Sequence, residues 1–507
     1  MKALAVVMFA LLSLPLSSFS QRQVLNERYV DAVTGKDRND GKSPERPWKT
    51  LDKVNAQTYG PGARILFRAG QAWKGQLHPK GSGSGDAPIV ISRYGEGARP
   101  LIDGGGSEAA IFLENQSGWR IEHLEVTNFD ETEEGTNLSK WENHNRTYWA
   151  EAPGVLPRYR IKRRLKNAIL VKAYDAGVVS NLHFKDLEIH GVNGDITDKN
   201  NGGIFLQISG DKTPTYFDDL LVEGCHIHDV DRTGISNMSS WENRTRADDG
   251  NWTPSRRVVI RGNVFERTGA NALIVRVAQD PLVERNLFDH CAIKESGNAN
   301  FPFNCDGALF QYNESRFTQY NSGDADAGGF DSDYRCKNTV IQYNYSHHNE
   351  FGGVLICCMG ADTVARFNDG TIVRYNIFED NGGHTFRVAG TPTHSDVYGN
   401  IVLLNAARDS SQLIWHKSWR GFGHDTRYHH NLVYNQAQHV RVDLGKSTGN
   451  FFYKNWVLGT PIDGLPGASV DHGNTAMPDQ FKMLEEIDHL HGAWEKVAPK
   501  ADTIISK

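Results

Sequence analysis

A short apolar run, an asparagine and a second short apolar run recur together through the second half of the chain. The shared asparagines are Asn263, Asn286, Asn313, Asn344, Asn376, Asn400, Asn431 and Asn455, and they lie 23 to 32 residues apart. A period of this length, with short strands and no heptads, is typical of a solenoid in which each repeat forms one coil. The repeat therefore predicts an all-β fold of stacked parallel coils.

The asparagine column has a physical reason. Successive coils of a solenoid lie about 4.8 Å apart, so that each side-chain amide can bond the next one and satisfy buried backbone groups. Weaker earlier copies of the repeat place Asp186 and Gly224 at the same position. We expect the asparagines from Asn286 to Asn431 to form one internal column.

A second set of strands alternates with the asparagine strands. It comprises GGIFLQI from Gly202, TGISNMS from Thr233, NALIVRV from Asn271, GGFDSDY from Gly328, GGVLICC from Gly352, GGHTFRV from Gly382 and QLIWHKS from Gln412. We expect the Gly-Gly pairs to allow the bend into each strand. Variable spacing between the two sets predicts long loops on one side of the coil, where solenoids usually bind.

The ends of the chain differ from this repeat. Residues 1–20 carry one charge, at Lys2, before an apolar run, which is typical of a signal peptide and predicts a secreted or periplasmic protein. Residues 21–95 are expected to form an N-terminal cap with a short helix and the first strands, and residues 96–460 the coil. Residues 461–507 lose the repeat and are expected to form a C-terminal flanking segment with a helix.

The composition of the chain excludes some classes of binding partner. The formal net charge of -6 argues against nucleic acid, whose protein partners are usually basic. No segment after the signal peptide is long and apolar enough to span a membrane, and we expect a monomer. The six cysteines are too few for a disulfide framework in 507 residues. Two interpretations stay open: pairing of Cys291 with Cys305 and of Cys336 with Cys357 or Cys358, or buried thiols.

Two regions resemble a known group of proteins. They are YVDAVTGKDRNDGKSPERPWKTLDKVN with ILFRAGQAWKGQL and PLIDGGG, and later QYN, GGFDSDY and NTVIQYNYSHHN. Both resemble the secreted, pectin-lyase-like right-handed parallel β-helix proteins of bacterial polysaccharide degradation. The resemblance implies a single-stranded right-handed parallel β-helix and a polysaccharide or oligosaccharide substrate. Because the group contains both glycoside hydrolases and polysaccharide lyases, the reaction stays open.

The densest acidic constellation lies on one coil, at Asp324, Asp326, Asp331 and Asp333. Residues i and i+2 of a strand share a face, so that Asp331 and Asp333 point outward if Phe330 points inward. Their α-carbons would then lie about 6.5 to 7 Å apart, within reach of the separations that glycosidases use for two carboxylates. We predict these two as the catalytic pair, with Asp324 and Asp326 binding substrate.

Basic side chains accompany the acidic ones in the alignment of coils. Arg387 is expected in the column of Asp333 two coils later, and His416 in the following coil, as catalytic partners. Three further side chains are expected to bind substrate, namely Arg276, His384 and Lys417. Arranged as a ladder of salt bridges, the same charges could instead be purely structural.

Two insertions, at about residues 130–166 and 241–256, share the sequence WEN and are rich in aromatic residues. Aromatic faces stack on sugar rings, so we expect Trp141 and Trp241 to bind substrate, with Trp149 and Trp252 beside them over the acidic coil. Packing of the two loops on each other is the alternative.

The sequence is compatible with three functions. The preferred one is glycosidic hydrolysis by paired carboxylates without a cofactor. A lyase or epimerase would bind Ca²⁺ through Asp331 and Asp333 against a uronate, while Lys or Arg abstracts a proton. A glycan-binding or adhesion β-helix would need no convergent carboxylates, so their clustering favours an enzyme. Signatures of nucleotide-binding, esterase and zinc-protease sites are missing from the sequence.

Overall fold

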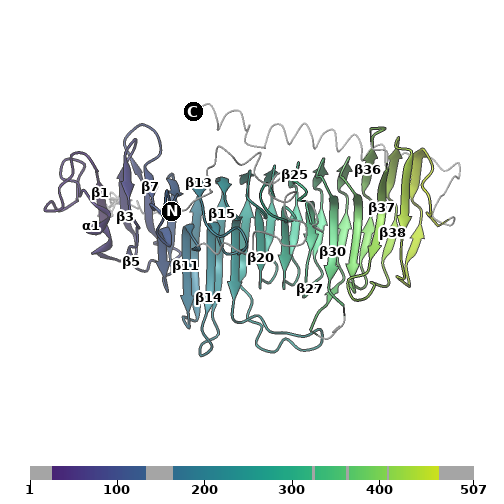
Figure 1. The fold of residues 1–507 in the computed structure, drawn as a ribbon. Helices are drawn as coiled ribbons and strands as arrows, with labels where there is room; N and C mark the ends of the chain where they lie inside the picture. The colour runs from purple at the N-terminus through teal and green to yellow at the C-terminus, as the bar shows by residue number, and fades with distance from the viewer. Residues whose placement is uncertain (1–25, 133–163, 322–325, 361–364, 408–409, 467–507) are drawn as a thin grey trace, which may run out of the picture.

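The computed structural model describes residues 26–132, 164–321, 326–360, 365–407 and 410–466. Over these residues the chain winds into an elongated parallel β-helix with its earliest coils at one end and its latest at the other (Figure 1). Three long sheets of 14, 13 and 11 strands run along the described part of the coil. Neighbouring strands in each sheet come from neighbouring coils, which confirms the solenoid predicted from the repeat.

We call these sheets first, second and third, in the order in which the chain visits them. The first runs from β1 (Asn26–Val30) to β41 (Phe451–Tyr453), and the second from β4 (Ala72–Lys74) to β42 (Trp456–Gly459). The third runs from β8 (Ala109–Glu114) to β40 (His439–Asp443). One coil shows the pattern, since β28 (Val340–Gln342), β29 (Tyr345–His347) and β30 (Gly352–Cys358) enter the three sheets in turn.

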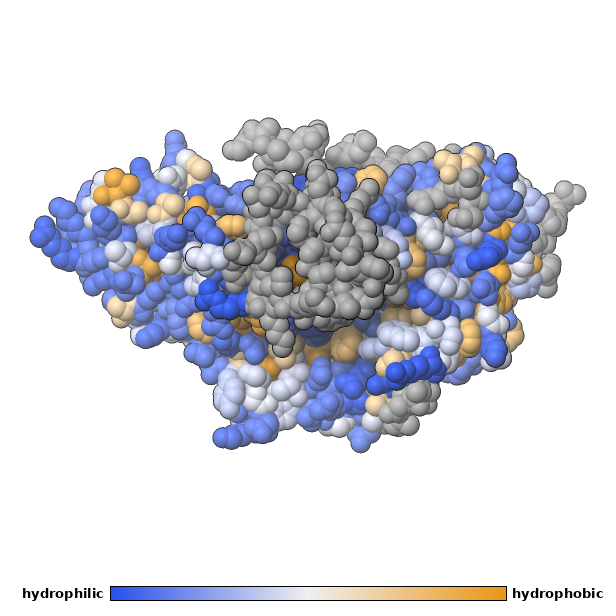
Figure 2. Space-filling view, viewed as in Figure 1, coloured by the Kyte–Doolittle hydropathy of each residue, from blue (hydrophilic) through white to orange (hydrophobic). Residues whose placement is uncertain are grey.

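Alternation along these short strands creates one continuous apolar core. In the first sheet Phe310, Ile341 and Val373 stand in register on successive coils, and each is at most 1% exposed. Burying such a side chain stabilises the fold by roughly 1.5 to 3 kcal/mol. The described surface on the face seen in Figure 2 is predominantly hydrophilic, as expected for strands whose alternate residues face water.

The asparagine column is confirmed along its whole predicted length. Asn344 shows the pattern: its side-chain nitrogen donates to Asn376 Oδ1 at 3.0 Å and to the carbonyl oxygen of Phe310 at 2.9 Å. The same side-chain contact links Asn263, Asn286, Asn313, Asn344, Asn376, Asn400, Asn431 and Asn455 in sequence. Each amide thus satisfies backbone groups that the turn leaves inside the coil.

The Gly-Gly pair at residues 328–329 is needed for a reason that the prediction did not include. A β-carbon on Gly329 would lie 2.4 Å from Ser346 Oγ and 2.8 Å from Asn349 Nδ2. Asn349 belongs to a second buried amide contact, in which its side chain donates to Asn381 Oδ1 at 2.8 Å. Glycine is needed because this polar column approaches the start of the strand, and Gly329 itself has no left-handed φ.

The N-terminal end carries the predicted short helix, α1 (Leu51–Asn55), which buries Leu51 and Val54. Thr50 caps it by accepting a hydrogen bond from the Lys53 backbone at 3.1 Å. The predicted signal peptide and the predicted C-terminal helix lie outside the described residues. In the described part of the chain no helix has the length and apolar character of a membrane span.

The structure decides between the two interpretations of the cysteines. All six are buried and none is in a disulfide. The sulfur atoms of Cys305 and Cys336 contact carbonyl oxygens instead, at 3.4 Å for Val275 and 3.5 Å for Pro302. Four of the thiols therefore act as small core side chains, namely Cys225, Cys291, Cys305 and Cys336.

Candidate active site

The acidic coil presents its carboxylates as the alternation predicts. Phe330 lies on β26 (Gly328–Ser332) in the core, in register with Val354 of β30. Asp331, its neighbour, therefore faces outward from the third sheet, and Asp333 follows just beyond the end of the strand. The strand period places Asp331 on the outer face, and Asp333 reaches the same cavity from just beyond the strand.

A cavity of about 510 Å³ opens on this face. The residues that line it are Lys199, Asn298, Phe301, Phe303, Asp326, Asp331, Asp333, Tyr334, Leu355, Cys357, Arg387, Ala389, Lys417, Ser418 and Trp419. Five of the predicted site residues thus meet in one place: Asp326, Asp331, Asp333, Arg387 and Lys417. The volume is of the size that small ligands occupy in proteins.

The two carboxylates share one neighbour. Cys357 Sγ lies 3.8 Å from Asp331 Oδ1 and 3.4 Å from Asp333 Oδ1. One oxygen of each carboxylate and this sulfur all lie within 4.8 Å of one another. Asp331 also accepts a hydrogen bond from Asn298 Nδ2 at 3.1 Å. The pair is closer than the 6.5 to 9.5 Å that an inverting glycosidase needs for an intervening water.

Burial and mutual repulsion set the protonation of the pair. Desolvation, then the charges of Asp333 and Asp326, raise the pKa of Asp331 well above its ordinary value. Desolvation also raises the pKa of Asp333, but the nearby Lys199 charge and the backbone N–H of Tyr334 oppose the change. Both carboxyl groups therefore have a raised pKa, and the Lys199 charge and the Tyr334 N–H favour the anion at Asp333.

Three cations stand on the walls of the cavity. Arg387 on β34 (His384–Gly390) is 5% exposed, and its guanidinium carbon lies 5.0 Å from the centre of the Trp415 ring. The Lys417 ammonium lies 4.9 Å from the same ring. The Lys199 ammonium lies 5.3 Å from the ring of Phe301. Stacking on aromatic faces holds these charges near the carboxylates.

The predicted register of Arg387 is wrong by two residues. Asp331 pairs with Leu355, and Leu355 pairs with Arg387, so Arg387 stands in the column of Asp331 rather than that of Asp333. A shift of two residues keeps each side chain on the same face of the sheet. Arg387 therefore reaches the cavity despite the error.

His416 is not where its predicted role requires. It lies on β37 (Ser410–Lys417) in register with Val388, two residues after the core residue Ile414. Its Nε2 lies 2.8 Å from the hydroxyl oxygen of Tyr428, in the interior of the coil. Burial lowers the pKa of His416 to about 4, so that a neutral imidazole fills the core.

His384 lies beside the cavity rather than on its wall. Its ring centre is 5.0 Å from that of Phe351 and 5.9 Å from that of Trp415. Burial, with the positive charges of Arg387 and Lys417, lowers its pKa well below the ordinary value. A neutral His384 therefore packs against the aromatic residues that hold Arg387.

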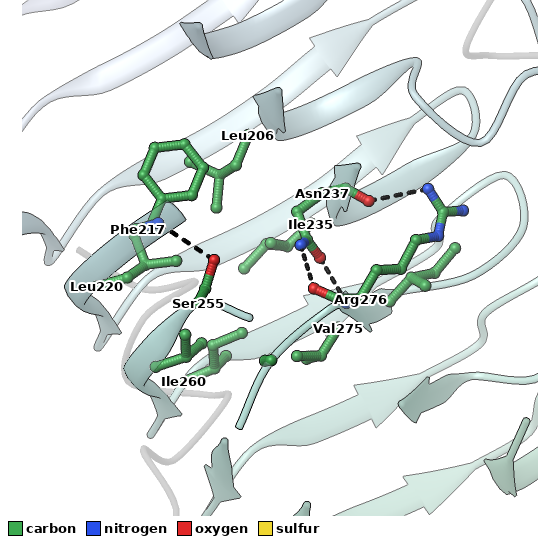
Figure 3. A pocket seen from close by; sticks show the side chains of 12 residues that line it. Leu206, Phe217, Leu220, Ile235, Asn237, Ser255, Ile260, Val275 and Arg276 are labelled. Atoms are coloured by element: carbon green, nitrogen blue, oxygen red, sulfur yellow. Dashed lines mark hydrogen bonds between the residues drawn. The ribbon is translucent and has the colours of Figure 1, made fainter. Parts of the chain in front are cut away.

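Arg276 on β20 (Leu273–Arg276) belongs to a separate, small cavity on the N-terminal side (Figure 3). Its guanidinium donates to the Asn237 carbonyl oxygen at 2.9 Å, while the Asn237 side chain accepts from the Arg276 backbone at 2.6 Å. Desolvation lowers the pKa of Arg276, and the Asp333 charge opposes that change. Arg276 thus influences the pair at a distance without lining its cavity.

The second aromatic insertion runs along the neighbouring corner of the coil. Trp241 is half-buried and packs against the main core, and Trp252 Nε1 donates to the Asn304 carbonyl oxygen at 3.2 Å. Arg244, between them in sequence, donates to Asp306 at 2.8 Å, and Arg246 donates to Thr393 at 3.1 Å. The loop thus straps several coils together below the third sheet (Figure 1). Neither tryptophan lines the cavity, contrary to the prediction.

Two predicted site residues, Trp141 and Asp324, lie outside the described residues, as does Trp149. In place of the predicted tryptophans the cavity has Phe301, Phe303, Tyr334 and Trp419. Phe301 and Phe303 stand on β23 (Asn300–Phe303), the strand before the acidic one. Their i, i+2 spacing was the signal that could have found them.

The donor set at the cavity fits Ca²⁺ poorly. Besides the two carboxylates it offers the Cys357 sulfur, whereas Ca²⁺ takes six to eight oxygen ligands. Desolvation and the adjacent carboxylates raise the pKa of Cys357 well above its ordinary value, so the thiol stays protonated. The arrangement favours proton transfer over calcium binding.

The chain is similar to known proteins in sequence and in fold. No family model matches the chain. A lacto-N-biosidase from Bifidobacterium longum subsp. longum is 25% identical over an alignment that covers 88% of this chain and 32% of that protein. The chain spans about a third of the length of this curated relative. The crystal structure of a GH136 lacto-N-biosidase from Eubacterium ramulus matches with a TM-score of 0.62 and 24% identity, covering 85% of this chain and 68% of that one. The structural match supports the parallel β-helix fold.

Proposed function

We propose that the chain is a glycoside hydrolase that cleaves a complex glycan with Asp331 and Asp333. The observation that carries this proposal is the pair itself: two buried carboxylates, close together, on the wall of one cavity. Acid-assisted glycoside cleavage requires two carboxyl groups, and a raised pKa keeps one of them protonated near neutral pH. A purely structural pair would be neutralised by cations in direct contact.

Asp331 is the proposed general acid and Asp333 the proposed nucleophile. Protonated Asp331 donates its proton to the glycosidic oxygen while the Asp333 carboxylate attacks the anomeric carbon, forming a glycosyl ester and releasing the leaving sugar. Asp331, now a carboxylate, takes a proton from water, and this water opens the ester and restores Asp333. The close approach of the two carboxylates supports this retaining course over an inverting one.

The remaining walls suit a sugar substrate. Phe301, Phe303, Tyr334 and Trp419 offer aromatic faces on which sugar rings stack. Lys199, Arg387 and Lys417 offer N–H donors for hydroxyl or carbonyl oxygens. No metal takes part in the proposed reaction.

The two relatives point to a first substrate class. Both carry the name lacto-N-biosidase, and we propose lacto-N-biosides as the first glycans to test. The sequence of residues 1–20 supports the further proposal that the enzyme acts outside the cytoplasm. We also propose that it acts as a monomer.

The test is hydrolysis of an aryl lacto-N-bioside together with a panel of plant, algal and host glycans. Release of reducing sugar, with retained anomeric configuration by NMR and no effect of EDTA, is the expected result. An unsaturated uronate product that requires added Ca²⁺ would instead establish a lyase. Absence of any cleavage, with glycan binding retained, would establish a binding protein.

A further inference from the structure

A second group of ionisable side chains lies on the second sheet, away from the third sheet that carries the cavity. Glu188 lies on β13 (Glu188–Val192), and His226 and His228 lie on the adjacent strand β16 (His226–Val230). Glu188 and His226 stand opposite each other in register. Because His226 and His228 are two residues apart, both imidazoles stand on the same outer face. One ligand atom from each residue lies within 4.8 Å of the other two.

Each imidazole is already held by a carboxylate through one ring nitrogen. His228 Nδ1 lies 2.7 Å from Asp229 Oδ2, and His226 Nε2 lies 3.2 Å from Glu266 Oε2. A carboxylate at one nitrogen fixes that nitrogen as the N–H, so the other nitrogen carries the lone pair. This carboxylate–histidine pairing is the support that metal-ligating histidines receive in proteins.

The opposite ring nitrogens are buried, and neither has a partner within ordinary hydrogen-bond distance. These atoms are His226 Nδ1 and His228 Nε2. The carboxylate nearest to His228 Nε2 is that of Glu188, at 3.7 Å, which is too long for a hydrogen bond. A buried ring nitrogen without a partner, as at His226 Nδ1, normally costs free energy. A cation bound by these three side chains would remove that cost and would take the place of the ring proton between His228 and Glu188.

We propose that Glu188, His226 and His228 bind a divalent transition-metal ion, with Zn²⁺ the best match. Two imidazoles and one carboxylate form a ligand set that Zn²⁺ uses, with water as a fourth ligand. Ca²⁺ and Mg²⁺ prefer oxygen ligands alone. The Glu188 side chain is 39% exposed, which gives an ion a path from solvent.

Neighbouring charges leave room for a cation. Arg267 is engaged by Asp229 at 2.7 Å. Arg99 is engaged mainly by Asp186, at 2.7 Å, and lies farther from Glu188, at 4.0 Å. His190 stacks on His228 and is itself held by a carboxylate, that of Glu125 at 2.9 Å.

The proposed site has a structural role. It joins β13 to β16 across two successive coils, on a different sheet from the catalytic pair. An ion there would tie the coils together and raise the melting temperature without entering the reaction.

The experiment titrates Zn²⁺ into the EDTA-dialysed full chain by calorimetry, with melting curves in parallel. We expect one Zn²⁺ per chain and a rise in Tm of about 2 °C or more at saturation. Glu188→Gln and His226→Gln should each weaken Zn²⁺ binding at least about tenfold, because each removes one metal ligand. Each should also abolish the rise in Tm. Co²⁺ in place of Zn²⁺ should give a spectrum without a thiolate charge-transfer band.

Two variants serve as matched controls. His347→Gln removes a histidine of the same sheet that pairs with Glu314 at 3.1 Å, and it should bind Zn²⁺ as the parent does. Cys357→Ser alters the other group of three potential ligands among the described residues, and it too should bind normally. No Zn²⁺-dependent change in Tm, binding that survives Glu188→Gln and His226→Gln, or binding lost in Cys357→Ser would each overturn the proposal.

Discussion

The inside and the outside of the coil treat polar groups in opposite ways. Inside, the Asn344 amide donates to both Asn376 and a backbone carbonyl, and the same bonds repeat on every neighbouring coil. Outside, Asp331 is 4% exposed beside a second carboxylate, and its close contacts are one amide and one thiol. The repeated interior bonds stabilise the fold. On the outer face, two adjacent buried carboxylates destabilise it, as is common at active sites.

The largest expected effect is on catalysis. Asp331→Asn and Asp333→Asn should each lower kcat by about a thousandfold or more, because each removes a group that makes or breaks a bond. Neither change should lower Tm, since each removes repulsion from a buried pair. Steady-state kinetics on the substrate identified above, with melting curves, measures both.

A matched control is Asp289→Asn. Asp289 also lies on the outer face, but it is paired with Arg316 at 2.9 Å, and its pKa is lowered to about 2. This change should leave kcat within about twofold of the parent, and its main effect should be a loss of stability, because Asp289 is partly buried and its ion pair with Arg316 is lost. Equal activity in the Asp331→Asn and Asp289→Asn variants would contradict the assignment of the catalytic pair.

The next effect is on the interior column. Asn376→Ala should lower the free energy of unfolding by about 1 to 3 kcal/mol, because the Ile341 carbonyl and the Asn344 amide lose a buried partner. The activity of the folded fraction should stay unchanged. Chemical denaturation measures the loss, with Gln438→Ala as the control. Gln438 is exposed, so its substitution should change the free energy of unfolding by less than about 0.5 kcal/mol. Equal stability of the two variants would show that the column is not needed.

The stability of Asp331→Asn relative to the parent should depend on pH. The folded-state pKa of Asp331 is raised above its unfolded value, so the protonated carboxyl is tolerated at low pH and the parent loses stability as pH rises through that raised pKa. The variant should therefore gain little at about pH 4, near the unfolded pKa, and most at about pH 8. Melting curves across this range measure the difference, and a gain that shrinks with rising pH would contradict the raised pKa.

The smallest effect concerns sugar binding. Trp419 is 40% exposed on the cavity wall, and its ring centre lies 5.5 Å from that of Tyr334. Trp419→Ala should raise KM about two- to tenfold with little change in kcat, since stacked aromatic contacts contribute about 0.5 to 1.5 kcal/mol. Trp456→Ala, at the far end of the second sheet, is the control and should leave KM unchanged. A fall in kcat without a change in KM would place Trp419 in the reaction instead.

Local alternation explains why part of the site was predictable. Asp331 and Asp333 could be placed on the outer face because Phe330 had to enter the core, and that choice needs only the strand period. The same rule, applied from Ile414, places His416 inside, where it contacts Tyr428. The prediction for His416 was wrong because a histidine can be buried in the core when it is neutral and has a hydrogen-bond partner there.

The sequence by itself determined the coil, the internal asparagine column and the outward direction of the carboxylates, because these follow from a repeat and from alternation within one strand. Only the tertiary structure decided which side chains meet at the cavity. Because the loops differ in length, the sequence does not fix the register between strands of adjacent coils. A register shift of two residues leaves every inward-facing and outward-facing side chain on the same face. The sequence therefore could not predict the register of Arg387, the position of Lys199 at the cavity or the path of residues 241–256. All three depend on contacts between distant coils.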